Sequence, residues 1–310
     1  MKINELTSRQ QINDPLLVVA VKEGVTNANA PYLSITFRDN TGTIEGKLWD
    51  VRDEQLAIVK PSLVIRVKGE VISYRNVLQL KVVGVESLDQ SAIDMTQYVL
   101  SGPYSQKTLR EGIDGAIRSI NNQDVFRIVS DIYRTYDGEI YASAAAARNH
   151  HEYYGGLATH VYSMLKLADM VCTNYPYLNR DLVVAGVLLH DIGKVVELKS
   201  GAVSEYTVAG RLLGHISIGD AMIAQSAAKL GIDSEVVVIL RHMILAHHGQ
   251  YEFGSPVLPS TIEAEALHFI DDIDARMTMI EKTLEATPSH EFSARSFAMD
   301  GRSFYNHDIK

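Results

Sequence analysis

Cysteine is almost missing from this chain, since Cys172 is the only one among its 310 residues. A single cysteine excludes an internal disulfide framework and any metal site built from thiolates, and it is typical of a reducing compartment. We therefore expect a cytoplasmic protein. If the protein binds a metal, histidine and carboxylate side chains must hold it.

Long hydrophobic runs are missing as well. No segment approaches the roughly 18 uninterrupted apolar residues of a membrane-spanning helix. The N-terminus, MKINELTSRQ, has no apolar core of the kind that signal peptides carry. We expect no membrane span and no secretion signal. The composition, at 46% hydrophobic and 22% charged, is that of a globular protein long enough for two domains.

The chain as a whole has no excess of positive charge, since its net charge is −9. This balance argues against broad, non-specific binding of nucleic acid. The charge is uneven, because residues 1–88 hold 11 Lys and Arg against 10 Asp and Glu, and the remainder holds 18 against 28. A polyanion would therefore meet least repulsion in the first part, and divalent cations would partly neutralise the second.

Residues 16 to 86 show the period of two that predicts β-strands. The candidate strands are LLVVAV (16–21), YLSITF (32–37), TIEGKLWD (43–50), LVIRVKGEV (63–71) and VLQLKV (77–82). A short helical stretch near 52–59 separates the third strand from the fourth. This pattern predicts a five-stranded barrel of the OB type over residues 14–88, preceded by an N-terminal segment, 1–13.

The outward positions of this barrel carry basic side chains and one aromatic ring, namely Lys47, Trp49, Arg66, Lys68 and Lys81. Cations neutralise phosphates and an aromatic ring stacks on a base, so these residues are candidates for binding single-stranded nucleic acid. The alternative is a solvated barrel face on which the lysines have no further role. The sequence favours neither interpretation.

From about residue 94 the apolar spacing becomes helical, apart from a short hairpin near 195–208. We place a domain boundary within 87–94, an all-α domain over 89–288 and a loosely docked tail over 289–310. The predicted fold class is therefore multi-domain α+β, with a five-stranded OB-type barrel followed by an all-α domain.

Several apolar segments of the helical part contain an imidazole or a carboxylate. These groups are His160, His190 with Asp191, His215, His247 with His248, and Asp271, which shares a helical face with Leu267 and Asp274. A buried carboxylate beside a buried imidazole is costly unless a cation meets it. One such histidine is unremarkable, but five segments together indicate a metal site with nitrogen and oxygen ligands. The pair His307-Asp308 follows no apolar helix and is excluded.

The order of these residues resembles the HD-domain phosphohydrolases. That family has a histidine, then a His-Asp pair, then a distal aspartate around a metal, and the matching residues here are His160, His190-Asp191 and Asp271. Lys194, in HDIGK, matches the lysine that many members direct at the scissile phosphate. The resemblance therefore implies that Asp191 and Lys194 are the catalytic residues.

Some members of this family have additional histidines between the His-Asp pair and the distal aspartate, and these members bind two or more metals. His215, His247 and His248 occupy the corresponding places in this chain. The resemblance implies two divalent ions per chain, bridged by Asp191. Manganese is the first expectation, and iron and cobalt are the alternatives.

The order of barrel and HD domain narrows the resemblance to the YhaM-type 3′→5′ exoribonucleases. This closer resemblance rests on the sequence segments DNTGTIEGKLWD, HHEYYGGLATH, LLHDIGK and GSPV. The resemblance implies hydrolysis of single-stranded RNA to nucleoside 5′-monophosphates by a metal-activated water. Single-stranded DNA is the alternative substrate, and a homo-oligomer is left open.

Two other functions remain open at this point. The protein is either a phosphodiesterase or phosphatase for small nucleotides, or a nucleic-acid-binding factor with a regulatory HD site. The sequence also does not decide the roles of His150, His151 and His242.

Overall fold

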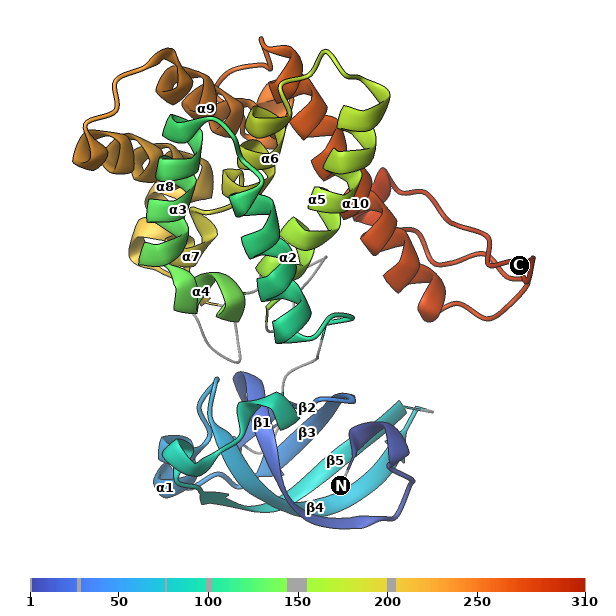
Figure 1. The fold of residues 1–310 in the computed structure, drawn as a ribbon. Coiled ribbons are helices and arrows are strands. Elements are labelled where there is room, and N and C mark those ends of the chain that lie inside the picture. The colour runs from blue at the N-terminus through green and yellow to red at the C-terminus, as the bar shows by residue number, and fades with distance from the viewer. Residues whose placement is uncertain are drawn as a thin grey trace. The chain divides into compact units, whose positions relative to one another are not determined.

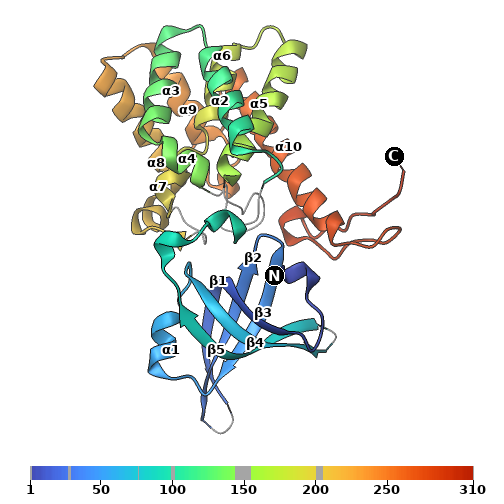
Figure 2. The same cartoon turned by 60° about the horizontal axis from the view of Figure 1, so that its bottom comes forward.

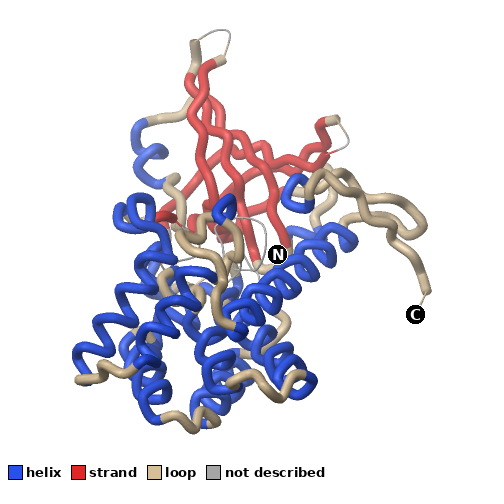
Figure 3. The backbone as a smooth tube through the Cα atoms, turned by 90° about the horizontal axis from the view of Figure 1, so that it is seen from above, coloured by secondary structure: helices blue, strands red, loops and turns tan. Residues whose placement is uncertain are grey.

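The structure is a computed structural model that describes residues 2–26, 29–75, 77–98, 102–143, 155–199 and 205–309. Its internal contacts divide the chain between residues 101 and 102 into an N-terminal and a C-terminal unit. Figure 1 labels the elements of both units. Figure 3 shows that the long strands belong to the first unit and the long helices to the second.

Five strands of the N-terminal unit close into a barrel. They are β1 (Gln11–Val25), β2 (Pro31–Asp39), β3 (Gly42–Trp49), β4 (Val64–Tyr74) and β5 (Val77–Ser87). Their order is β1-β2-β3-β5-β4, in which β3 and β5 are parallel and β4 pairs back to β1. The helix α1 (Asp53–Ile58) connects β3 to β4 (Figure 2). This arrangement confirms the predicted OB-type barrel.

The barrel interior follows from the alternation in the sequence. Leu33, Ile35 and Phe37 of β2 are buried, and the residues between them face outward. Gly46 makes room for the largest of these side chains, because a Cβ at Gly46 would lie 2.7 Å from the ring of Phe37. The outward positions are therefore the ones available to a ligand.

Short 3-10 turns complete this unit on both sides of the strands. In the first turn, η1 (Ile3–Glu5), Ile3 packs into the barrel core together with Leu6. After η2 (Gln90–Ala92) and η3 (Met95–Gln97), Tyr98 packs against Leu17 and Val64. The internal contacts thus divide the chain after residue 101, because apolar side chains beyond the last strand pack against the barrel. The domain boundaries expected from the sequence stay predictions.

The C-terminal unit is helical, as the sequence predicts. Its helices are α2 (Gln106–Arg118), α3 (Gln123–Thr135), α4 (Asp137–Ala142), α5 (Gly156–Asn174), α6 (Arg180–Leu189), α7 (Lys194–Glu197), α8 (Val208–Leu230), α9 (Glu235–Ala246) and α10 (Ile262–Glu285). The predicted hairpin consists of β6 (Leu198–Lys199) and β7 (Glu205–Tyr206). None of the helices in the described part of the chain has the length and hydropathy needed to cross a bilayer.

The helix α6 lies at the centre of this unit, and this explains why it is apolar all round. Residues 183–189 are buried, and the helix contacts α5, α9 and α10. A Cβ at Gly186 would lie 2.5 Å from Met243 of α9 and 3.0 Å from Leu267 of α10. The glycine therefore allows close packing of three helices, and this brings the end of α6 to the site described below.

The C-terminal tail, which the sequence predicts to be loosely docked, forms two paired arms in the structure. Its two arms pair through the bridges Phe292–Tyr305 and Ser296–Arg302. At the turn between them, η5 (Phe297–Met299) buries Met299, which is 1% exposed. Backbone pairing at this short range leaves no helical or strand periodicity for sequence reasoning to detect.

Candidate metal centre

The end of α6 presents two buried polar side chains, His190 and Asp191. The Nδ1 of His190 donates to the carbonyl oxygen of Val187 at 2.9 Å. This bond selects the tautomer whose Nε2 carries the lone pair, and Nε2 lies 3.3 Å from Oδ2 of Asp191. The helix end thus directs an imidazole nitrogen and a carboxylate oxygen to the same point.

Two further helices bring their side chains to that point. Nε2 of His160, on α5, lies 3.3 Å from Nε2 of His190 and 4.0 Å from Oδ2 of Asp191. The same atom lies 3.1 Å from Oδ1 of Asp271, on α10. The four residues of the predicted first site are therefore together, and His160, His190 and Asp191 offer ligand atoms within 4.8 Å of one another.

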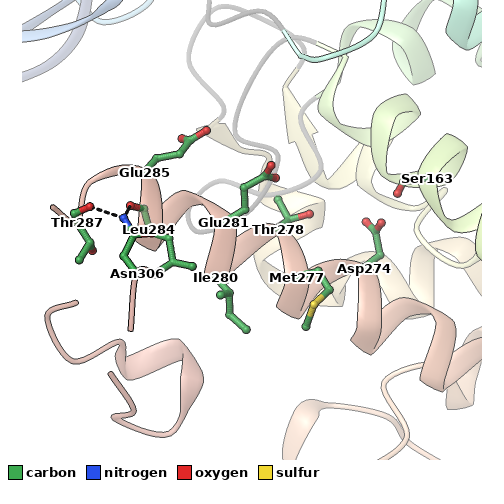
Figure 4. A pocket seen from close by; sticks show the side chains of 10 residues that line it. All are labelled: Ser163, Asp274, Met277, Thr278, Ile280, Glu281, Leu284, Glu285, Thr287 and Asn306. Atoms are coloured by element: carbon green, nitrogen blue, oxygen red, sulfur yellow. Dashed lines mark hydrogen bonds between the residues drawn. The ribbon is translucent and has the colours of Figure 1, made fainter. Parts of the chain in front are cut away.

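Asp274 fixes the ring of His160 from behind. The Nδ1 of His160 donates to Oδ2 of Asp274 at 2.7 Å, and both residues are buried. A carboxylate behind an imidazole orients the ring and makes it a better metal ligand. Sequence reasoning placed Asp274 on the face of Asp271 and gave it no role, although the spacing of three residues was the available signal. Figure 4 shows Asp274 on α10 and Ser163 on α5, which line one open cavity of about 810 Å³.

Three histidines form a second cluster. His215 follows a kink in α8, and His247 and His248 follow the end of α9. The Nδ1 of His247 donates to the Ile244 carbonyl, and that of His248 donates to the Phe253 carbonyl, each at 2.7 Å. Ligand atoms of the three histidines lie within 4.8 Å of one another. The predicted second set is therefore also assembled.

Asp191 lies between the two clusters. Its Oδ1 is 3.5 Å from Nε2 of His215 and 4.0 Å from Nε2 of His247. Among the residues that the structure describes, these three buried atoms have no hydrogen-bond partner. Such burial costs free energy unless something satisfies the lone pairs, and a divalent cation would satisfy all three. The donor set of imidazole and carboxylate suits manganese, iron or cobalt.

The charge of the first cluster is balanced within the protein. Burial by itself lowers the pKa of His160, but its hydrogen bonds to Asp271 and Asp274 outweigh burial and raise that pKa to about 10. Burial likewise raises the pKa of Asp271, but the bond to His160 outweighs it and holds that pKa far below its usual range. In the metal-free chain, a proton on His160 therefore supplies part of the positive charge that the carboxylates require.

The surroundings of Asp191 and His247 favour the protonation states in which these residues can bind a metal. Burial raises the pKa of Asp191, but the nearby charge of Lys194 and the contact with His190 outweigh it and hold that pKa well below its usual range. Burial, assisted by His248, holds the pKa of His247 well below its usual value. Metal ligands must be ionised carboxylates and neutral imidazoles, and Asp191 and His247 meet these conditions near pH 7.

Glu197 holds His215 in place. Its Oε1 accepts from the backbone N–H of His215 at 3.0 Å and lies 3.4 Å from Nδ1 of the same residue. The contact is possible because Gly214, with φ +71, breaks α8 just before His215. Sequence reasoning missed Glu197, whose only signal is its place three residues after Lys194.

The remaining histidines have other positions. His242 accepts at Nε2 from the backbone N–H of Ser260 at 2.9 Å, which indicates a structural role. His150 and His151 lie outside the described residues. The excluded Asp308 pairs with His290 in the tail, with 2.8 Å between Nε2 and Oδ2.

Lys194 is the cation nearest to Asp191 in the described residues, and its Nζ donates to Oδ2 of Asp191 at 2.6 Å. Both residues line a cavity of about 380 Å³, which His248 and Asp271 also line. An ammonium group and groups of both clusters therefore open to the same space.

In the barrel, an aromatic pair forms a platform on the outer face of β2 and β3. The rings of Tyr32 and Trp49 lie 4.9 Å apart, and Nζ of Lys47 lies 5.0 Å and 5.5 Å from their centres. Lys81 of β5 is the register partner of Lys47. Sequence reasoning missed Tyr32, because only the register between β2 and β3 places it beside Trp49.

Arg66 and Lys68 are not part of this platform. They lie on β4, which β5 separates from β3 in the barrel. Arg66 donates to the backbone oxygen of Asn13, and Lys68 pairs with Glu86. The five predicted basic and aromatic residues therefore fall into two groups.

The helical unit matches a known family. The family model described as HD domain matches residues 157–276, a range that holds every residue of the two clusters. This unit is therefore an HD domain, a class of domain that depends on divalent metal.

Two curated relatives cover nearly the whole chain. The 3′-5′ exoribonuclease YhaM of Geobacillus sp. (strain WCH70) is 40% identical over 297 residues, which are 96% of this chain and 92% of the relative. The protein of the same name from Bacillus subtilis (strain 168) is 39% identical over 297 residues, 96% of this chain and 95% of the relative. The chain belongs to the YhaM exoribonuclease family, which confirms the resemblance seen in the sequence.

One solved structure is similar in sequence to part of the chain. The second OB-fold domain of replication protein A from Methanococcus maripaludis is 26% identical, covering 30% of this chain and 98% of that domain, with a TM-score of 0.25. A score this low adds nothing to the assignment of the barrel, which rests on its strand order.

Replacing Gly193 tests whether the turn after Asp191 must approach α8 closely. A Cβ at Gly193 would lie 2.0 Å from the carbonyl oxygen of His215 and 2.9 Å from the amide nitrogen of Gly219, and neither backbone atom can yield easily. We expect Gly193→Ala to lower the free energy of unfolding in urea by about 1–3 kcal/mol and to reduce bound metal. In Gly115→Ala, whose Cβ meets open space, both quantities should be maintained. Equal behaviour of the two variants would contradict this packing argument.

Replacing Asp274 tests its role behind His160. We expect Asp274→Asn to weaken metal binding about 10–100-fold, because the amide cannot provide the negative charge that orients and polarises the imidazole. Metal titration followed by calorimetry would measure this change, and circular dichroism should stay the same. The control Glu281→Gln removes a charge further along α10 and should bind metal normally. An unchanged affinity in Asp274→Asn would refute the role.

Proposed function

We propose that this protein is a metal-dependent 3′→5′ exoribonuclease, which removes nucleoside 5′-monophosphates from single-stranded RNA, with single-stranded DNA as the alternative substrate. The observation that carries the proposal is the set of unsatisfied buried atoms of Asp191, His215 and His247, which face one another in an HD domain. The names of the full-length relatives supply the direction of hydrolysis and the RNA substrate.

The proposed ligands form two sets that share Asp191. One set is His160, His190, Asp191 and Asp271, and the other is Asp191, His215, His247 and His248. This division supports two ions per chain, with manganese first and iron or cobalt as alternatives. Bound divalent ions would polarise the phosphodiester and lower the pKa of an attacking water.

Lys194 would act on the phosphate itself. Its ammonium group is directed by the contact with Oδ2 of Asp191 and opens into the cavity. A donor fixed there stabilises the negative charge that develops on a phosphoryl oxygen during the reaction. Asp191 therefore has two roles, since it shares charge with the metal sites and orients the lysine.

The barrel would hold the strand. Tyr32 and Trp49 offer ring faces to bases, and Lys47 with Lys81 offers charge to phosphates. Arg66 and Lys68 would contribute to the long-range attraction of the strand, because their local contacts are within the protein. A cytoplasmic location and a homo-oligomeric state stay predictions.

Asp191 and Lys194 should respond differently to replacement. Asp191→Ala removes the residue between the two clusters, so we expect loss of metal and loss of RNA hydrolysis with helical circular dichroism nearly intact. Lys194→Ala should keep its metal and lose about 100-fold in turnover. Elemental analysis and a manganese-dependent nuclease assay measure both effects. RNA hydrolysis at the wild-type rate by Asp191→Ala would disprove the proposed centre, and metal loss in Lys194→Ala would make the lysine structural.

Trp49→Ala tests the platform. Loss of one stacked base should weaken the binding of single-stranded RNA by about 1–3 kcal/mol, while metal content remains normal. Tyr74→Ala is the matched control, because Tyr74 is 54% exposed on the same barrel and lies outside the platform. Fluorescence anisotropy with a labelled oligoribonucleotide measures the binding. If Trp49→Ala binds RNA as tightly as Tyr74→Ala, this platform does not hold the strand. The alternative function, hydrolysis of small nucleotides, would then be favoured.

A further inference from the structure

The lining of the cavity beside Asp191 changes from charged to apolar along α10. Asp271, Ala275 and Met279 line it at intervals of four residues, so they share one face of the helix. With a rise of about 1.5 Å per residue, Met279 lies about 12 Å along the axis from Asp271. The wall therefore runs from a carboxylate at the proposed metal site to a thioether well away from it.

The size of the cavity limits what it can hold. Its volume of about 380 Å³ lies near the low end of the range for small-molecule sites, which is roughly 300–1,000 Å³. Such a cavity accepts one nucleotide-sized group and excludes a duplex end. A group with a charged phosphate at one end and a flat, less polar base at the other matches the change in the wall.

Phe253 contributes an aromatic ring to this cavity. It ends the turn η4 (Tyr251–Phe253), and its side chain is 56% exposed. Its backbone carbonyl accepts from Nδ1 of His248 at 2.7 Å. One residue therefore holds a histidine of the second cluster through its backbone carbonyl and also lines the cavity.

The C-terminal tail supplies another wall. Ala298 lines the cavity from the turn η5, while its neighbour Met299 is buried. The turn is closed by the N–H groups of Gly301 and Arg302, which donate to the carbonyls of Ser296 and Met299. A small side chain at residue 298 therefore stands at a fixed position, more than a hundred residues after Asp191 in the sequence.

We propose that this cavity is the subsite for the 3′-terminal nucleotide, in which the base stacks on Phe253 and the tail turn at Ala298 limits the depth to one nucleotide. The inference rests on the proposed nuclease function and specifies its substrate contacts. It also gives the tail a role in substrate binding. Hydrolysis then occurs one nucleotide from the end, because the phosphate that reaches Lys194 is the 5′-phosphate of the nucleoside held in the cavity. Water breaks its bond to the O3′ of the preceding nucleotide, so a nucleoside 5′-monophosphate leaves and the strand keeps a new 3′-hydroxyl.

The first test compares two neighbouring aromatic residues. Phe253→Ala leaves the backbone carbonyl that holds His248, so metal content should not change. We expect KM for single-stranded oligoadenylate to rise about fivefold or more, with a smaller change in kcat, because one stacking contact is lost. Tyr251→Ala is the matched control, since Tyr251 is 61% exposed in the same turn and does not line the cavity. Its KM should equal that of the wild type.

The second test fills the cavity from the tail. Ala298→Trp should reduce kcat/KM for oligoadenylate about tenfold or more, since the indole occupies space needed by the terminal nucleotide. It should also weaken the binding of adenosine 5′-monophosphate measured by calorimetry with manganese present. Ala294→Trp places the same ring on an exposed tail residue outside the cavity and should change neither value.

The outcomes separate this inference from the function on which it rests. If the wild-type protein with manganese releases no mononucleotide from RNA, the proposed function fails. If the wild type is active and Phe253→Ala and Ala298→Trp match their controls in KM and in nucleotide binding, the subsite is overturned while the nuclease function stands. Loss of metal in Phe253→Ala would also overturn it, because the ring would then serve the fold.

Discussion

The buried carboxylate of Asp191 is the group on which the arrangement of the helical unit depends. One of its oxygens contacts Lys194 and His190, and the other faces His215 and His247. A charge in the protein interior is tolerated only when several positive or hydrogen-bonding groups meet it. The ends of α6 and α9, the kink of α8 and the faces of α5 and α10 supply these groups. The helices therefore converge where the cost of burial would otherwise be greatest.

In the proposed function, hydrolysis and strand binding belong to different units. The HD domain holds ionisable groups that are buried and fixed by second contacts, as Asp274 fixes His160 and Glu197 fixes His215. The barrel instead carries Tyr32, Trp49 and Lys47 on its outer face, where Trp49 is exposed and the other two are half-buried. Rigid positioning is required for a reaction at one bond, whereas stacking on an exposed platform tolerates any base.

Much of the candidate site could be predicted from the sequence, because its candidate ligands come from segments with strong local patterns. His160 and Asp271 interrupt apolar faces of helical spacing, and His190-Asp191 ends a helix that is apolar all round. The residues that support them have weaker signals. Glu197 lies in a short helix beside a hairpin, and its partner is eighteen residues away across a kink. The backbone bonds of His247 and His248 leave no trace in the sequence, because any residue offers a carbonyl.

The sequence by itself determined the order of barrel and helical domain, the residue types available to hold a metal and the family, since periodicity and residue type are local properties of the chain. Only the tertiary structure decided which side chains share a surface. It separated Arg66 and Lys68 from the Trp49 platform, placed Tyr32 within that platform and brought Ala298 to the cavity at Asp191. The reason is physical: strand register, helix close approach and the return of the tail depend on contacts between residues far apart in the chain, and these contacts have no local pattern.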